Sequence, residues 1–154
     1  MDMSIHRTKC AALIKNVVAP CMFNDLLKDI GESRYSLIID ESTDISSVKQ
    51  LCAVIRYFST SLKKIVSTYL GLIDLQGENA VAIASTLTTF LESVGIDFMR
   101  CVGQGTDGCS VMVGNNNSVY KHLRAKNEKL QLVKCVCHSA QATLSKHCPE
   151  IWSS

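Results

Sequence analysis

The chain has 154 residues, 47% of them hydrophobic and 19% charged, which is typical of one globular domain and excludes a disordered or fibrous chain. Sixteen Lys and Arg against fourteen Asp and Glu leave a net charge of +2, which does not by itself indicate a nucleic-acid-binding protein. The longest stretches without a charged side chain, such as 79–91, are shorter than the roughly 18 residues of a membrane span, and no signal peptide is visible. We therefore expect an intracellular protein without membrane contact.

The N-terminal segment, residues 1–34, is predicted to be helical. Its apolar positions recur at spacings of three and four on either side of Pro20, which fits two short helices or one helix kinked there. Gly31 is expected to end the helix. Residues 35–154 then form the second predicted unit, the main α/β core.

Three strands are predicted at the start of this core. Residues 35–40 form an almost continuously apolar run that ends in Asp40, which is typical of a buried strand whose last side chain emerges from the sheet. After a polar loop at 41–47, the runs 51–58 and 65–73 predict a hairpin of two longer strands.

The rest of the chain alternates between helices and strands. The predicted elements are a helix at 79–94, a strand at 98–102, a glycine-rich turn at 103–108, a broken short helix within 110–126, a strand at 130–136 and a helix starting at 139–147. This order predicts an α/β, ribonuclease H-like fold, with a mixed five-stranded sheet flanked by helices and cut short at the C-terminus. In that fold the fourth strand lies parallel to the first.

Two carboxylates stand at the ends of the strands expected to be neighbours. Asp40 ends the first strand and Asp107 follows the fourth. Parallel neighbours bring both acids to one edge of the sheet, and one or two carboxylates with waters suffice to hold Mg²⁺ or Mn²⁺. The alternative is that each Asp only caps a turn or helix, as Glu41 and Asp44 are expected to do.

Two other kinds of site are alternatives to a Mg²⁺ or Mn²⁺ site at Asp40 and Asp107. The run Gly103–Gly108 satisfies G-x-G-x-x-G, but Asp107 would place a negative charge inside the phosphate cradle of a dinucleotide site. Soft ligands for structural zinc occur near the C-terminus at a spacing tighter than usual. These ligands are Cys135, Cys137, His138, His147 and Cys148.

The remaining cysteines are most simply small buried hydrophobes in a reducing compartment, because a chain of this size needs no disulfide staples. They are Cys10, Cys21, Cys52, Cys101 and Cys109. His138 has its own alternative reading, as a core histidine that donates to a backbone carbonyl.

Three motifs in order resemble the core of hAT-superfamily transposases and of transposase-derived proteins with a zinc-finger N-terminus. They are LIIDESTD at 37–44, GTDGCSVMVG at 105–114 and CVCH at 135–138. The resemblance implies a ribonuclease H-like core in which Asp40 and Asp107 are two of three metal-binding catalytic carboxylates. It also places His138 near the active site, and it implies DNA as the partner and the nucleus as the location.

The sequence departs from the pattern of the family that it resembles in two respects. The family's third acid lies beyond a large helical insertion, and its zinc finger lies upstream, so we expect a fragment that by itself binds Mg²⁺ or Mn²⁺ only weakly. Any self-association is expected to run through the missing regions. The leading hypothesis is a partial core of an enzyme that cleaves and joins DNA strands. The alternative is a domesticated, non-catalytic interaction module with the same fold.

Overall fold

The computed structural model describes residues 6–43 and 48–135. The chain begins with one continuous helix, made of α1 (Arg7–Leu13), a π-helical turn η1 (Ile14–Val18) and α2 (Ala19–Ile30). The π-helical turn lies directly before Pro20, whose ring nitrogen cannot donate to the preceding turn. Gly31 ends the helix as predicted, with a φ of +46° and its N–H bonded to the carbonyl of Leu27.

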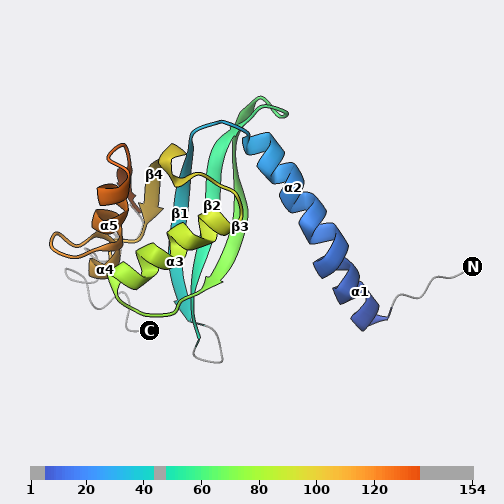
Figure 1. The fold of residues 1–154 in the computed structure, drawn as a ribbon, viewed down its shortest axis with the longest axis horizontal. Helices are drawn as coiled ribbons and strands as arrows, with labels where there is room; N and C mark the ends of the chain where they lie inside the picture. Colours follow the sequence, from blue (N-terminus) through green and yellow to red (C-terminus); the bar gives the residue numbers. More distant parts are fainter. Residues whose placement is uncertain (1–5, 44–47, 136–154) are drawn as a thin grey trace, which may run out of the picture.

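This helix projects away from the rest of the molecule (Figure 1). Its C-terminal part is anchored: Phe23, Leu26 and Leu27 pack against the core, and the Asp29 carboxylate accepts hydrogen bonds from the Tyr57 hydroxyl at 2.8 Å and the Ser61 hydroxyl at 2.8 Å. By length and composition alone, the 24 residues Arg7–Ile30 could cross a membrane. Those two criteria are met by many soluble helices, and the expectation of no membrane contact stays a prediction.

The sheet has five strands in the order β3-β2-β1-β4-β5, as the ribonuclease H-like fold requires. The strands are β1 (Tyr35–Thr43), β2 (Lys49–Ser59), β3 (Lys64–Asp74), β4 (Cys101–Thr106) and β5 (Gln131–Lys134). β1, β2 and β3 pair antiparallel, while β4 pairs parallel with β1 and with β5. The predicted mixed five-stranded sheet is therefore confirmed.

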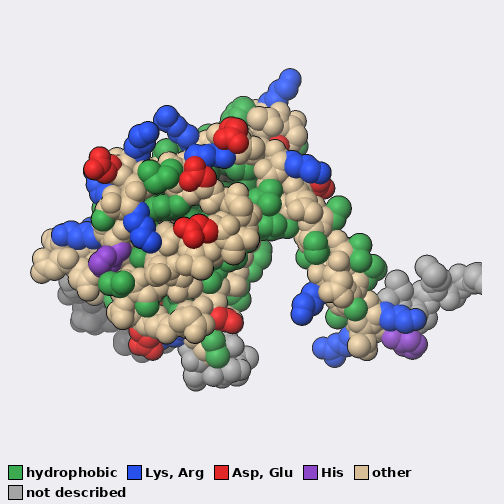
Figure 2. Space-filling model, viewed as in Figure 1, with side chains coloured by type: hydrophobic (Ala, Val, Ile, Leu, Met, Phe, Trp, Pro, Cys, Tyr) green, Lys and Arg blue, Asp and Glu red, His purple; other side chains and the backbone are tan. Residues whose placement is uncertain are grey.

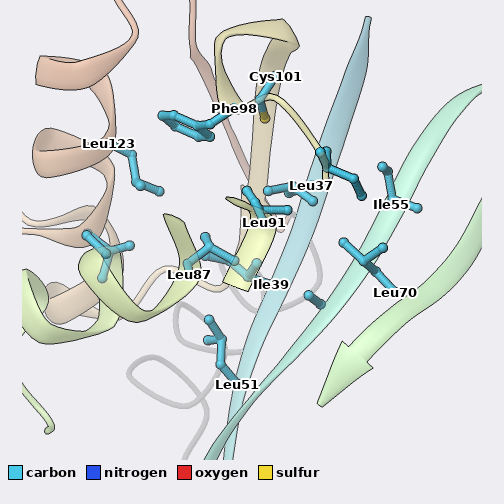
Figure 3. Close-up of a cluster of buried hydrophobic side chains, with 14 of the residues drawn as sticks. Leu37, Ile39, Leu51, Ile55, Leu70, Leu87, Leu91, Phe98, Cys101 and Leu123 are labelled. Carbon is cyan, nitrogen blue, oxygen red and sulfur yellow. The ribbon is translucent and has the colours of Figure 1, made fainter. Parts of the chain in front are cut away.

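Helices cover one face of this sheet (Figure 1). They are α3 (Ala80–Ser93), α4 (Ser110–Val113) and α5 (Val119–Lys126), with a 3₁₀ turn η2 (Phe98–Arg100) before β4. Asn79 caps α3 by accepting a hydrogen bond from the backbone N–H of Ala82 at 2.8 Å. Leu37 and Ile39 of β1 pack beneath Leu87 and Leu91 of α3, and this apolar layer is the core (Figure 3).

The opposite face of the sheet carries exposed apolar side chains. Strand alternation and register put Ile38, Val54 and Tyr69 in one row across β1, β2 and β3, and Gly105 and Val133 continue it across β4 and β5. Ile38 is 41% exposed and Val133 63%. Within the described residues, no helix covers this face.

The bounds of the fourth strand and the end of the first strand differ from the sequence prediction. Residues 98–100 form a 3₁₀ turn, and the fourth strand instead includes Gly103 and Gly105, which were expected in a turn. They lie in the strand because their α-carbons face β1 closely: a Cβ on Gly103 would lie 2.6 Å from the Ser36 Oγ. β1 also continues to Thr43, through part of the expected polar loop. The predicted helix at 139–147 lies outside the described residues.

Candidate functional site

The candidate site lies where β1 and β4 run side by side. Leu37 and Ile39 of β1 point into the core, each 1% exposed, so alternation turns Ile38 and Asp40 to the opposite face. Ile38 is paired with Gly105 in parallel register. Asp40 lies two residues beyond Ile38 in β1, and Asp107 directly follows the last residue of β4, so both stand at the same edge of the sheet.

The two carboxylate residues line one cavity of about 310 Å³. Asp40 is exposed and Asp107 half-buried. Asp107 also shapes the turn after β4, because its carboxylate accepts a hydrogen bond from the backbone N–H of Cys109 at 3.4 Å. Asp107 therefore has the turn-capping role that was the alternative to metal binding. This hydrogen bond uses one carboxylate oxygen, and the other is available to a cation.

A third strand completes the cavity. Val133 and Lys134 of β5 and the following Cys135 line it together with Ile38 and Gly105. The backbone N–H of Cys135 donates to the carbonyl of Thr106 at 2.9 Å, so the chain that leads to His138 leaves from this edge. His138 itself lies outside the described residues. Lys134 was not singled out from the sequence, although a cation inside an otherwise apolar predicted strand was the signal available.

Two buried polar side chains lie on β4 near the cavity, and Thr106 is one of the residues that line it. Gln104 is 1% exposed and Thr106 4% exposed. Within residues 6–43 and 48–135, neither the Gln104 amide nor the Thr106 hydroxyl has a hydrogen-bond partner, which is unusual for buried polar groups. Sequence reasoning missed both, because a Gln inside a glycine-rich segment reads as part of a turn.

The donor set suits a hard cation that keeps several waters. Among residues 6–43 and 48–135, no three His, Cys, Asp or Glu side chains gather into one metal-binding group. Two carboxylates are nevertheless a sufficient protein contribution for Mg²⁺, so Asp40 and Asp107 are the residues that would hold it. Glu41 faces elsewhere and is paired with the Lys49 ammonium at 3.3 Å, in agreement with its having no assigned catalytic role.

The described residues test the dinucleotide site fully and the structural zinc site only in part. The dinucleotide reading is wrong, since Gly103 and Gly105 belong to β4 and form no phosphate-binding loop. For the zinc reading, only Cys135 is described, and Cys137, His138, His147 and Cys148 lie outside the described residues.

Of the five cysteines that were expected to be buried free thiols, one is fully buried. Cys101 is buried, and burial raises the pKa of its thiol to about 11. Cys52 is half-buried. Cys10, Cys21 and Cys109 are exposed, contrary to prediction, because the N-terminal helix projects from the sheet and the turn after β4 lies at the surface.

A comparison with known families agrees with this architecture. Residues 5–118 match the family described as ZMYM1/FAM200, RNase-like domain (DUF4371). The match spans the N-terminal helix, β1 to β4 and both Asp40 and Asp107. It confirms the resemblance to transposase-derived proteins with a ribonuclease H-like core. The chain therefore belongs to the ZMYM1/FAM200 RNase-like domain family.

Proposed function

We propose that this domain is the metal-binding part of a transposase-derived, hAT-type catalytic core that acts on DNA. Asp40 and Asp107 hold a divalent cation, Mg²⁺ or Mn²⁺, against a phosphodiester. The observation that carries the proposal is the parallel register of β1 and β4, which brings both carboxylates to one cavity. Family membership supports a nuclear, DNA-associated protein.

Each lining residue has a role in this proposal. A bound divalent cation would polarise the phosphoryl oxygens and activate a nucleophilic water or 3′-hydroxyl. The carboxylates of Asp40 and Asp107 orient the phosphate through that cation, and the ammonium of Lys134 offsets the charge of a neighbouring phosphate. By resemblance, His138 joins them from the end of β5. Ile38 and Val133 give the cavity an apolar floor against which a deoxyribose can pack.

Cleavage requires more than these residues. In-line displacement with two cations needs ligands that hold the ions about 3.5 to 4 Å apart, and the resemblance assigns a third acid to a region beyond this sequence. We therefore expect the chain alone to bind the cation weakly and to leave DNA intact. With a net charge of +2, its DNA binding should be weak and lost at modest salt.

A second candidate is a non-catalytic interaction module that kept the fold. The observation that favours it is the lining of the cavity, in which Ile38, Ile39 and Val133 outnumber the two carboxylates. Such a lining also suits an apolar protein side chain. In this case the intact protein would not cleave DNA even with its remaining acid in place.

Mn²⁺ binding, followed by electron paramagnetic resonance of the free ion, tests the proposal. Asp40→Asn and Asp107→Asn should each weaken binding, and the double variant should abolish it. Glu92→Gln, which neutralises an exposed acid on α3, is the matched control and should bind as wild type. Equal binding by the double variant and the wild type would contradict the site.

A nuclease assay in Mn²⁺ with the same variants tests whether this chain cleaves DNA by itself. No cleavage is expected. Cleavage by the wild type that the double variant loses would show that these described residues and their neighbours already suffice for catalysis.

A further inference from the structure

The N-terminal helix carries a run of exposed apolar side chains that faces solvent. Their exposed fractions are between 40% and 67%, and their spacings of one, three and four residues place them along one side of the helix. We call this set the helix stripe. It consists of Leu13, Ile14, Val17, Val18 and Met22.

Nothing in the described part of the chain covers the helix stripe. Every residue from Arg7 to Met22 is exposed, and packing against the core begins at Phe23, Leu26 and Leu27. At the lower end of the stripe, Met22 lines an open cavity of about 330 Å³ between the helix and Thr68, Tyr69 and Leu70 of β3. The projecting segment and the green side chains along it are visible in Figure 2. A helix of this length is marginally stable in water without a packed face, and a contiguous exposed apolar patch marks an interaction surface.

Charge is distributed unevenly along the same helix. Its N-terminal half carries Arg7, Lys9 and Lys15 and no acid, whereas its C-terminal half carries Asp25 and Asp29 with a single base, Lys28. Asp29 is already bonded to Tyr57 and Ser61. Asp25 is 69% exposed and has only a 3.7 Å ion pair with Lys28, which is 79% exposed.

This arrangement is self-complementary when two copies of the helix run antiparallel. With the two-fold axis beside Val17 and Val18, Leu13 of one copy lies opposite Met22 of the other. The basic N-terminal turn, with Lys9, then approaches Asp25 of the other copy. A parallel pair would instead set Lys9 against Lys9. Antiparallel pairing buries the stripe and pairs opposite charges at both ends, and it closes with the same patch on both subunits.

We infer that the helix stripe is a homodimer interface, in which a second copy of this chain packs antiparallel on the N-terminal helix. The inference is independent of the metal site, since none of its residues lines that cavity. It differs from the sequence-based expectation that self-association would use regions missing from the chain. Each sheet's open cavity stays accessible in such a dimer, because it lies at β1, β4 and β5, away from the helix on the β3 side.

Light scattering coupled to size-exclusion chromatography of the full chain tests the interface. The run should be made under reducing conditions, because Cys10 and Cys21 are exposed, and over a hundredfold range of concentration. The wild type should change from monomer to dimer, and Val17→Asp should stay monomeric throughout. Val81→Asp introduces the same charge at an exposed valine of α3 and should dimerise as wild type.

Charge exchange tests the antiparallel orientation. Lys9→Glu and Asp25→Lys should each raise the dimer dissociation constant at least several-fold, and the double variant should recover most of that loss. Circular dichroism of each variant checks that the helix itself is intact.

Three results would overturn the inference. One is a monomer at every concentration. Another is a dimer that Val17→Asp leaves intact but Ile65→Asp abolishes, which would place the contact on the open sheet face. The last is a monomer that binds phosphatidylcholine vesicles through the stripe, since the helix would then be a membrane-contact segment.

Discussion

Ile38 of β1 and Gly105 of β4 are register partners in a parallel pair. A Cβ on Gly105 would lie 3.4 Å from the Ile38 Cγ1, which is an ordinary van der Waals distance, so this pair is in contact across the two strands. Asp40, two residues beyond Ile38 in β1, and Asp107, which directly follows β4, line the same cavity. The candidate metal site thus depends on a backbone pairing between segments far apart in the sequence.

Asp40→Asn should change the free energy of unfolding very little, because the Asp40 side chain is exposed and neutralising one of two neighbouring carboxylates removes like-charge repulsion. Leu37→Ala or Ile39→Ala should cost on the order of 2 to 5 kcal/mol, since each creates a cavity in the core. Urea unfolding of the three variants measures both. A large loss for Asp40→Asn would mean that Asp40 is structural.

Asn127→Ala should destabilise the fold by about 1 to 3 kcal/mol, because it leaves buried backbone groups without partners. The Asn127 amide is 1% exposed and donates to the carbonyls of Phe98 at 3.1 Å and Cys101 at 2.8 Å. It thereby fixes the end of α5 to the start of β4. Denaturant unfolding measures the loss, and a near-neutral result would show that water replaces the amide.

Gln104→Met should be neutral or stabilising, in contrast to Asn127→Ala. The Gln104 amide is buried without a hydrogen-bond partner among the described residues, so replacing it by an apolar side chain of similar size removes a desolvation cost. Thermal unfolding beside the Asn127→Ala variant checks the pair. A strong loss of stability would reveal that Gln104 bonds a buried water or a group beyond the described residues.

Gly71→Ala should destabilise the packing of α3 on β3. An added Cβ at Gly71 would lie 2.6 Å from the Cζ of Phe90, so the ring or the helix must move, at a cost of about 1 to 3 kcal/mol. Gly108→Ala is the control, because a Cβ there meets nothing within 4 Å. Equal melting temperatures for the two variants would contradict the close contact.

Asp29 should make the anchoring of the N-terminal helix sensitive to acid. Hydrogen bonds from the Ser59 and Ser61 hydroxyls lower the pKa of the Asp29 carboxyl below its ordinary value of 3.8. A carboxyl whose folded-state pKa is lowered stabilises the fold above its unfolded pKa, and that contribution is lost as the pH falls below it. Melting temperatures between pH 6 and 2 should therefore fall less steeply for Asp29→Asn than for wild type.

Asp25→Asn serves as the control for that experiment, run at a concentration at which the chain is monomeric. Asp25 lies on the same helix but is exposed, and its ion pair is with Lys28 of that helix. Its pH profile should follow the wild type. A profile that matches Asp29→Asn instead would mean that acid loosens the helix through general charge and not through the Asp29 hydrogen bonds.

Short-range patterns in the sequence were sufficient for most of the secondary structure. The three- and four-residue spacing from Ile83 to Leu91 predicts α3, and Gly31 predicts the end of the first helix, because helical period and glycine conformation are local properties. The apolar run to Asp40 predicts a buried β1 for the same reason. The family resemblance, carried by motifs around Asp40 and Asp107, was also readable from the sequence and is confirmed by the family match.

Only the tertiary structure decided what those local elements do together. Gly103 and Gly105 lie in β4, where the sequence indicated a turn, because pairing with β1 outweighs the weak strand propensity of glycine. Cys10 and Cys21 are exposed because the helix that carries them leaves the sheet. The union of Asp40, Asp107 and Lys134 in one cavity depends on strand order and register, which are non-local contacts that no short window of sequence contains.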